Sequence, residues 1–342
     1  MKILIIVGSE VHEYRRELYS GLGNIHDVTI FTEKSIKIPN CNVKLFKTFK
    51  IGKIRVQPNV LFEIYKRNYD KIIVVGNFSL LVNGLVLLFG RTDKIICWGF
   101  WPTSNILFDF LRAYVIKRGV PQIFYAKSHE NYYKNQINAN FISITATNTV
   151  YVDSLVVDKF TSDNKKHLIF VGSLNKRKGL ENTILSLAPL LLKYKIKFII
   201  FGDGSERENL EQLCLKNNVE DLVVFKGGCN DAEILSNFYG SSVCEISPNQ
   251  AGLSVQRSLA HGVPFITLKT AVSGGEIDSI IDGYSGFKCV NMQSIIGSVE
   301  LLLSNSHIQK KMCDFSKQMY QDQLTMDNMI KKFNEVIMYE SK

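Results

Sequence analysis

The sequence predicts an α/β protein built from two doubly wound domains in tandem. From the first residues onward, short apolar, β-branched runs alternate with segments of helical periodicity. A polar and charged stretch at residues 151–166 interrupts this alternation once, after which it starts again. A length of 342 residues also favours two domains over one. Because such chains form parallel sheets covered by helices, we expect ligands at the carboxyl ends of the strands, in a cleft between the domains.

The predicted first domain covers residues 1–150. Residues 3–7 form its first strand, because the apolar run before Gly8 is short for a signal peptide and lacks a small-residue cleavage site. Residues 14–23 form a helix, since Tyr14, Leu18 and Leu22 share one face and a glycine ends the pattern. Further strands are predicted at residues 28–31, 71–75, 94–98, 122–125 and 141–145.

The predicted second domain covers residues 167–315 and follows the linker at residues 151–166. Strands are expected at residues 168–171, 197–201, 222–225 and 243–246, and after Pro264. Helices are expected at residues 179–194, 206–216, 231–238 and 252–262. The tail has a helical pattern, so residues 316–342 are expected to form a helix that returns towards the first domain.

Composition favours a protein of the reducing cytosol that has no membrane span. The seven cysteines are scattered, odd in number and without a CxxC pair, which argues against disulfides and against a zinc site. The longest apolar run, residues 80–89, is interrupted and too short to cross a bilayer. We therefore expect a soluble cytoplasmic protein or one held peripherally on the inner face of the cell membrane.

The formal charge of +9 is unevenly placed. No acidic residue occurs between Glu33 and Glu63, where lysines such as Lys44, Lys47 and Lys50 alternate with apolar residues. This pattern suits an anionic membrane surface or lipid headgroup. It equally suits a solvated hairpin whose lysines protect an edge strand. Nucleic acid is not an expected partner, because base-stacking aromatic residues are not arrayed with the charge.

Three glycine-bearing loops are predicted at the carboxyl edge of the second sheet. Residues 172–179 (GSLNKRKG) combine two glycines with three consecutive cations, and residues 202–204 (GDG) follow the next strand. In residues 247–264 (SPNQAGLSVQRSLAHGVP), a loop leads into a short helix that opens at Gly252. The first-turn N–H groups of such a helix suit a phosphate, which Lys178 or Arg177 could neutralise. Taken alone, the basic loop could equally be a solvated turn.

Several other site types are disfavoured. Neither a GxGxxG fingerprint nor a Walker loop follows a predicted strand, and no Asp-x-Asp pair is present to hold a metal on a diphosphate. The histidines show no metal-ligand spacing. His12 lies in the loop after the first strand, where it could act chemically or be a solvent-exposed loop residue. Trp98 and Trp101 could stack on a sugar or lipid, or serve in packing.

The order of motifs in the second domain resembles the nucleotide-sugar domain of GT-B fold glycosyltransferases of family 4, the retaining group called group 1. The motifs are FVGSLNKRKG at residues 170–179, IFGDG at 200–204, VFKG at 224–227, GLSVQRSLAHGVP at 252–264, and residues 276–286. Weaker echoes in the first domain, at Tyr14–Arg15, Trp98–Gly99 and Asn148–Thr149, resemble members that build bacterial surface polysaccharides. The resemblance implies two Rossmann-like domains.

The resemblance also implies roles for individual residues. Gly172 and Lys178 match the diphosphate-binding loop, and Lys226 matches a position near the base. The full set of candidates is as follows: catalytic Lys178, Arg177 and His12; donor-binding Gly172, Ser173, Gly204, Lys226, Asn249, Gln250, Gly252, Leu253, Ser254 and Arg257; acceptor- or membrane-binding Tyr14, Arg15, Lys44, Lys47 and Lys50. No metal and no cofactor are expected beyond the nucleotide-sugar substrate.

The sequence departs from the family pattern at three positions. Ser173 replaces the usual arginine, and Arg177 could supply the missing charge. Asn249 and Arg257 stand where the family usually carries two glutamates separated by seven residues. Either this is an active, divergent subgroup in which Asn249, Gln250 or Gln256 binds sugar hydroxyls, or it is a non-catalytic relative.

The resemblance therefore implies metal-independent transfer of a sugar, with retention, from a nucleotide-sugar donor to a lipid-linked or glycan acceptor in surface polysaccharide (O-antigen or capsule) synthesis. A nucleotide-sugar epimerase of the same fold and a non-catalytic partner protein are the alternatives.

Overall fold

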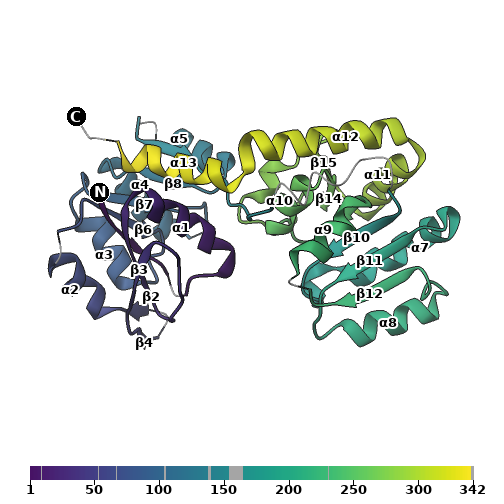
Figure 1. Ribbon diagram of the computed structural model, residues 1–342, viewed down its shortest axis with the longest axis horizontal. Coiled ribbons are helices and arrows are strands. Elements are labelled where there is room, and N and C mark those ends of the chain that lie inside the picture. Colours follow the sequence, from purple (N-terminus) through teal and green to yellow (C-terminus); the bar gives the residue numbers. More distant parts are fainter. Residues whose placement is uncertain are drawn as a thin grey trace. The chain divides into compact units, whose positions relative to one another are not determined.

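The computed structural model describes residues 1–339 except 9, 53, 67, 104, 138–139, 154–164 and 230. The chain divides into two compact units, the first formed by Met1–Tyr151 with Met326–Lys342 and the second by Val152–Thr325. Most of the predicted linker lies outside the described residues. Figure 1 shows that each unit contains strands flanked by helices, and the predicted fold class of two parallel-sheet α/β domains is confirmed.

Unit 1 is a seven-stranded parallel sheet with the order β3-β2-β1-β6-β7-β8-β9. Its elements are β1 (Lys2–Ile6), the 3-10 helix η1 (Glu13–Arg15), α1 (Arg16–Ile25), β2 (Asp27–Thr32), β3 (Cys41–Leu45), β4 (Phe49–Ile51), β5 (Ile54–Val56), α2 (Pro58–Lys66), β6 (Lys71–Val75), α3 (Leu81–Phe89), β7 (Ile95–Trp98), α4 (Ile106–Lys117), β8 (Gln122–Phe124), α5 (Lys127–Ile137), β9 (Ser143–Thr145) and α13 (Met326–Ile337).

Both faces of the unit 1 sheet are buried, which explains the nearly continuous apolar runs of its central strands. Ile3 and Ile5 of β1 pack in the same cluster as residues of α1 and α13. Leu4 and Ile6 face the other side and pack with residues of α2 to α5. Strands β4 and β5 form a separate antiparallel hairpin within the acid-free stretch, as one of its two interpretations predicts.

Unit 2 is a six-stranded parallel sheet with the order β12-β11-β10-β13-β14-β15. Its elements are β10 (His167–Val171), the 3-10 helix η2 (Lys176–Lys178), α7 (Leu180–Tyr194), β11 (Lys197–Phe201), α8 (Arg207–Lys216), β12 (Val223–Gly227), α9 (Ala232–Gly240), β13 (Ser242–Ile246), α10 (Leu253–Ala260), β14 (Phe265–Leu268), the 3-10 helix η3 (Glu276–Ser279), β15 (Gly286–Cys289), α11 (Met292–Ser304), α12 (Ser306–Met319) and the π-helical turn η4 (Tyr320–Leu324).

The tail predicted as a helix over residues 316–342 contains the end of α12, η4 and α13. Tyr320 and Leu324 are buried with residues of α10 in unit 2. Met326, Met329 and Phe333 are instead buried in unit 1, beneath α1 and β1. The apolar contacts therefore place the boundary between the two units between Leu324 and Met326. Of the elements in this tail, α13 alone belongs to unit 1.

None of the helices in the described ranges has the length and apolar character needed to cross a membrane.

Candidate functional site

The carboxyl edge of the unit 2 sheet has its switch point between β10 and β13. Strand β10 pairs with β11 on one side and with β13 on the other, so the loops after β10 and β13 diverge from neighbouring positions. Such a point is the usual ligand position in an open parallel sheet. The loops concerned are residues 172–179 and 247–252, both of which the sequence predicts as ligand loops.

Backbone contacts hold the first two glycine loops together. The Gly172 N–H donates to the Phe201 carbonyl at 2.9 Å, and the Gly202 N–H donates to the Gly227 carbonyl at 2.8 Å. Gly202 has φ +149°, and a Cβ there would lie 1.8 Å from the Gly172 oxygen. A Cβ on Gly204, at φ +157°, would lie 2.3 Å from the Leu174 oxygen. Only glycine fits at these two positions, so the loop packing depends on backbone shape rather than on side chains.

Lys178 lies at the centre of this arrangement. It ends η2, and Gly179 at φ +72° turns the chain into α7. The Lys178 Nζ lies 3.1 Å from where a Gly172 Cβ would be, and 6.0 Å from the centre of the Phe170 ring. Burial lowers the pKa of Lys178, the Arg177 charge lowers it further, and Glu245 opposes the change. The ammonium group is thus half-buried at the strand end, while Arg177 is exposed.

The third loop reaches the same place. The Asn249 side-chain nitrogen lies 2.5 Å from the position of a Gly179 Cβ, so the loops after β10 and β13 touch. Helix α10 begins after Gly252 without a side-chain cap. The first-turn N–H groups of any helix lack intrahelical acceptors, and here no capping side chain accepts from those of Leu253 and Ser254. Among the described residues, a Cβ on Gly252 would meet only the Gln250 Nε2, at 3.7 Å, so the approach to the helix start is open.

Glu245 is a component of the site that the sequence interpretation missed. It lies in β13 with no exposed surface, and Tyr239 donates to its Oε2 at 2.8 Å. Its Oε1 has no hydrogen-bond partner among the described residues. Burial raises the pKa of Glu245 to about 8, and Tyr239, Ser254, Arg257 and Lys178 limit the rise. The signal available in the sequence was an acidic residue inside a predicted buried strand.

The remaining donor-site candidates lie in varied surroundings. Ser173 is exposed and accepts a hydrogen bond from Asn175 at 2.9 Å. Lys226 is exposed and lies 5.5 Å from the centre of the Phe238 ring. Arg257 is half-buried and contributes charge near Glu245. Gln256 is fully buried and donates to Ser279 at 3.0 Å, so it is not placed to bind a sugar hydroxyl.

In unit 1, Arg15 occupies an aromatic cage at the carboxyl edge of the sheet. Its guanidinium carbon lies 4.4 Å from the Trp98 ring centre, 5.0 Å from that of Tyr14 and 5.2 Å from that of Tyr125. Arg15 and Trp98 are both buried, so both side chains contribute to packing. His12 is exposed and stacks on Tyr14 with 5.7 Å between ring centres. The structure therefore places His12 on the loop surface and leaves a chemical role as a prediction.

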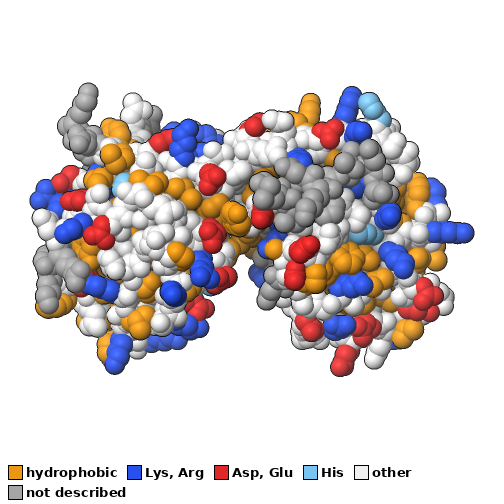
Figure 2. Space-filling model, in the orientation of Figure 1, with side chains coloured by type: hydrophobic (Ala, Val, Ile, Leu, Met, Phe, Trp, Pro, Cys, Tyr) orange, Lys and Arg blue, Asp and Glu red, His pale blue; other side chains and the backbone are white. Residues whose placement is uncertain are grey.

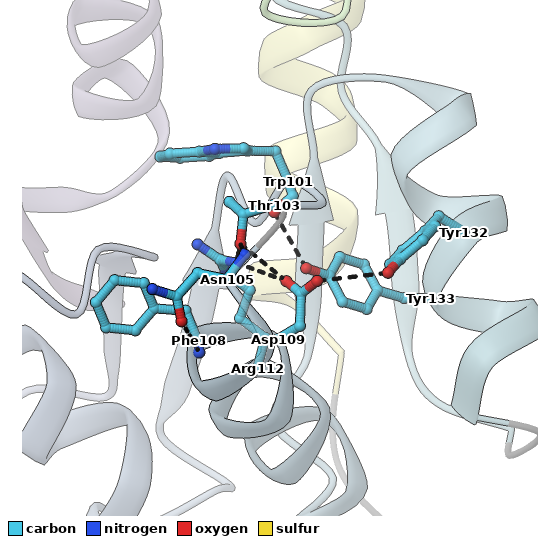
Figure 3. A network of polar contacts seen from close by, with 8 residues as sticks. All are labelled: Trp101, Thr103, Asn105, Phe108, Asp109, Arg112, Tyr132 and Tyr133. Carbon is cyan, nitrogen blue, oxygen red and sulfur yellow. Dashed lines mark hydrogen bonds and ion pairs between the residues drawn. The ribbon is translucent and has the colours of Figure 1, made fainter.

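Trp101, unlike Trp98, is exposed. Figure 3 shows its ring above a polar network on α4. Buried Arg112 donates to Asp109 at 2.7 Å and to Thr103 at 2.9 Å, and Tyr132 donates to the other Asp109 oxygen at 3.4 Å. The network therefore links Thr103, which precedes α4, to that helix, and the Arg112 guanidinium carbon lies 5.7 Å from the centre of the Trp101 ring.

The three lysines predicted to bind an acceptor or a membrane differ in their partners. Lys44 forms an ion pair with Glu63. Lys47 and Lys50 are exposed. Within the described ranges, no group of three or more His, Cys, Asp or Glu side chains is arranged to hold a metal ion.

Comparison with known proteins agrees with this architecture. Residues 155–321 match the family described as glycosyl transferases group 1. An uncharacterized glycosyltransferase of Methanocaldococcus jannaschii is 27% identical over 175 residues, which is 50% of this chain and 44% of that protein. The chain spans about half the length of the sequence relatives that it matches.

Solved structures are similar over nearly the whole chain. A glycosyltransferase from Rickettsia africae ESF-5 has a TM-score of 0.75 at 13% identity, over 98% of this chain and 97% of that one. Anabaena HepE in complex with UDP has a TM-score of 0.73 at 14% identity, over 98% and 99%. The chain thus has the fold of GT-B glycosyltransferases, and its second unit matches the glycosyl transferases group 1 family over residues 155–321.

Proposed function

We propose that the chain is a retaining glycosyltransferase that moves a sugar from a nucleotide-sugar donor to a hydroxyl group of a lipid-linked or polysaccharide acceptor. One observation carries the proposal: Lys178, the Gly172 and Gly202 loops and the uncapped start of α10 meet at the switch point of unit 2. This combination of a half-buried cation, open N–H groups and close-packed glycines suits a diphosphate.

The donor diphosphate would contact Lys178 and the N–H groups of Gly252, Leu253 and Ser254. Arg177 is exposed beside Lys178 and adds positive charge at the edge of the site. The amides of Asn249 and Gln250, on the loop that leads to Gly252, offer donors and acceptors for the sugar hydroxyls. Since Gln256 is buried, Asn249 and Gln250 remain as replacements for the usual glutamates.

In the proposed reaction, the bond between the sugar C1 and the diphosphate oxygen breaks and a new bond forms to the acceptor oxygen on the same face. The acceptor proton leaves on a phosphate oxygen of the nucleoside diphosphate, which departs with the bonding electrons. Lys178 and the first turn of α10 stabilise the charge that develops on the leaving group. We propose that these groups take the place of a metal ion, so activity should persist in a chelator.

Synthesis of a bacterial surface polysaccharide, at the cytoplasmic face of the membrane, is the setting that we propose. Unit 1 offers exposed apolar side chains for peripheral attachment. On α3, Leu81, Leu85 and Phe89 are 39%, 36% and 74% exposed. On α4, Leu107 and Phe110 are 63% and 66% exposed. Large apolar residues gathered on neighbouring helices mark an interaction surface, and a lipid-linked acceptor would bring a membrane to it.

The first experiment is a thermal-shift measurement with UDP, GDP, dTDP and CMP at millimolar concentration. The UDP complex of the similarly folded Anabaena protein makes UDP the first nucleotide to test. We expect one nucleotide to raise the melting temperature, and Lys178→Ala to abolish the increase. Lys176→Ala is the matched control, because Lys176 is in the same 3-10 helix but exposed. A protein that responds to none of these nucleotides would not support the proposal.

Product analysis then separates the alternatives. A transferase consumes its nucleotide sugar only when an acceptor is present, and the product keeps the anomeric configuration. An epimerase converts or hydrolyses the donor without an acceptor. A non-catalytic partner protein binds no nucleotide at all. Donor conversion without an acceptor, or the absence of nucleotide binding, would contradict the proposed transferase activity.

A further inference from the structure

A cavity of about 620 Å³ opens at the carboxyl edge of the unit 1 sheet. Residues that follow β1, β2 and β3 line it, including Glu10, Lys34 and Lys47, and so does the hairpin formed by β4 and β5. It therefore lies at the strand ends where parallel sheets bind ligands, within the unit to which no donor residue is assigned.

The charges that line this cavity are unbalanced. Lys34 forms an ion pair with Glu10, and the Thr48 hydroxyl donates to Glu33. Lys47, Lys50 and Arg55 also line the cavity and make no ion pair with any residue that the structure describes. The lining thus carries four cations, Lys34 included, against the two carboxylates of Glu10 and Glu33, and this net positive charge makes the cavity an attractive place for an anion.

The hairpin forces two of these cations together. Lys50 of β4 lies directly opposite Arg55 of β5 in the antiparallel pair. Like charges in that position repel each other and destabilise a hairpin. The Arg55 N–H donates to the Ser79 carbonyl at 2.9 Å, which fixes the hairpin to the start of α3. An anion bound between the two side chains would remove this repulsion. A bound anion would therefore explain why Lys50 and Arg55 lie opposite each other.

We infer that this cavity binds a phosphate or diphosphate group of the acceptor. The inference rests on the proposed transferase function, because it assigns the acceptor to this sheet edge. Three unpaired cations match the multiple charges of a phosphate ester better than a single carboxylate. Phe49, Ile51 and Ile54 of the same hairpin are 58%, 70% and 48% exposed, which suits an apolar chain attached to the phosphate.

Figure 2 shows Lys and Arg side chains beside hydrophobic ones on the part of unit 1 where Figure 1 labels β4. The lysines of the acid-free stretch differ in whether they form an ion pair and in whether they line the cavity. Lys44 is neutralised by Glu63 and does not line the cavity, whereas Lys47 and Lys50 do.

The test is calorimetric titration of the full chain with inorganic pyrophosphate. Because pyrophosphate should also enter the donor site, the titrations use the Lys178→Ala background. We expect Lys47→Gln/Lys50→Gln to weaken the remaining pyrophosphate binding about tenfold or more, because two charge-assisted contacts are removed. Arg55→Gln should have an effect in the same direction. Lys37→Gln/Lys117→Gln is the matched control, since both lysines are exposed in unit 1 and neither lines the cavity.

Co-sedimentation with vesicles distinguishes the source of the phosphate. If a lipid headgroup is bound, vesicles containing phosphatidylglycerol retain the protein and Lys47→Gln/Lys50→Gln releases it, while pure phosphatidylcholine retains neither. If the phosphate belongs to a soluble acceptor, only the pyrophosphate titration responds. The inference would be overturned if pyrophosphate affinity fell equally in the Lys47→Gln/Lys50→Gln variant and in the control, or if it fell in neither. Nucleotide binding by the original chain is measured separately, so failure of the donor site is recognised independently.

Discussion

The carboxyl edges of the two sheets differ in what holds their loops. In unit 2, the backbone of Gly202 lies against that of Gly172, the backbone of Gly204 lies against that of Leu174, and Lys178 is half-buried next to Gly172. In unit 1, the corresponding edge carries a hairpin whose exposed lysines line an open cavity. The unit 2 edge is therefore defined by backbone shape, and the unit 1 edge by charge. Substitutions should damage folding at the first edge and ligand binding at the second.

The largest effect is expected for Gly202→Ala in unit 2. A Cβ there would lie 1.8 Å from the Gly172 oxygen at a φ of +149°, so both loops would have to move. We expect the free energy of unfolding to fall by about 4 kcal/mol, which urea denaturation can measure. Gly252→Ala is the control, because a Cβ there would meet only one side-chain atom of the described residues, at 3.7 Å. We expect this substitution to lower the free energy of unfolding by less than about 1 kcal/mol. Similar losses in both variants would contradict the backbone-defined interpretation.

The second effect concerns the charge buried beneath the unit 2 edge. Burial raises the pKa of Glu245 to about 8, so the folded protein binds its proton more tightly than the unfolded chain does. The resulting stability is present at low pH and is lost as the pH rises through about 8. Relative to Glu245→Gln, we expect the wild-type free energy of unfolding to fall by about 3 kcal/mol between about pH 5 and pH 8.

The neutral Glu245→Gln keeps an acceptor for Tyr239, so it isolates the ionisation. The buried His167 and His261, whose pKa values burial lowers to about 4, titrate in both proteins and cancel in the difference. Parallel pH profiles for the two proteins would mean that Glu245 is ionised in the folded state throughout this range.

A third, intermediate effect is expected in unit 1 for Arg15→Lys. The flat guanidinium stacks on Trp98, Tyr14 and Tyr125, and an ammonium cannot make the same contacts. The loss should be about 1–2 kcal/mol of unfolding free energy. Arg16→Lys is the matched control, because Arg16 is partly exposed and pairs with exposed Glu13, so its replacement should be neutral. An Arg15 variant of unchanged stability but reduced acceptor use would assign Arg15 to binding instead.

The smallest effect tests the open edge of unit 1 itself. Gly52, in the turn between β4 and β5, has a φ of +60°, and no atom of the described residues lies within 4 Å of where its Cβ would be. Gly52→Ala should therefore cost only the backbone strain, about 1 kcal/mol in thermal or urea unfolding. Gly228→Ala, which has equal space without a positive φ, should be neutral. A loss as large as that of Gly202→Ala would show that the hairpin is packed as tightly as the unit 2 loops.

Much of the architecture was predictable, because hydrophobic periodicity is a local property of the chain. The strand predicted at residues 71–75 is β6, and the one at 197–201 is β11. The three glycine loops were predicted to meet, and contacts of Gly172 with Gly202 and of Gly179 with Asn249 bring them together. The roles assigned to individual site residues stay predictions that the experiments above address.

The sequence by itself determined the alternation of strands and helices, the glycines of the loops and the surplus of cations in the acid-free stretch. The tertiary structure alone decided that Glu245 is buried beside Lys178, that Lys44 is neutralised by Glu63, and that Lys50 faces Arg55 at the cavity. The reason is physical: periodicity depends on near neighbours in the chain, whereas desolvation and ion pairing depend on groups that only folding brings together.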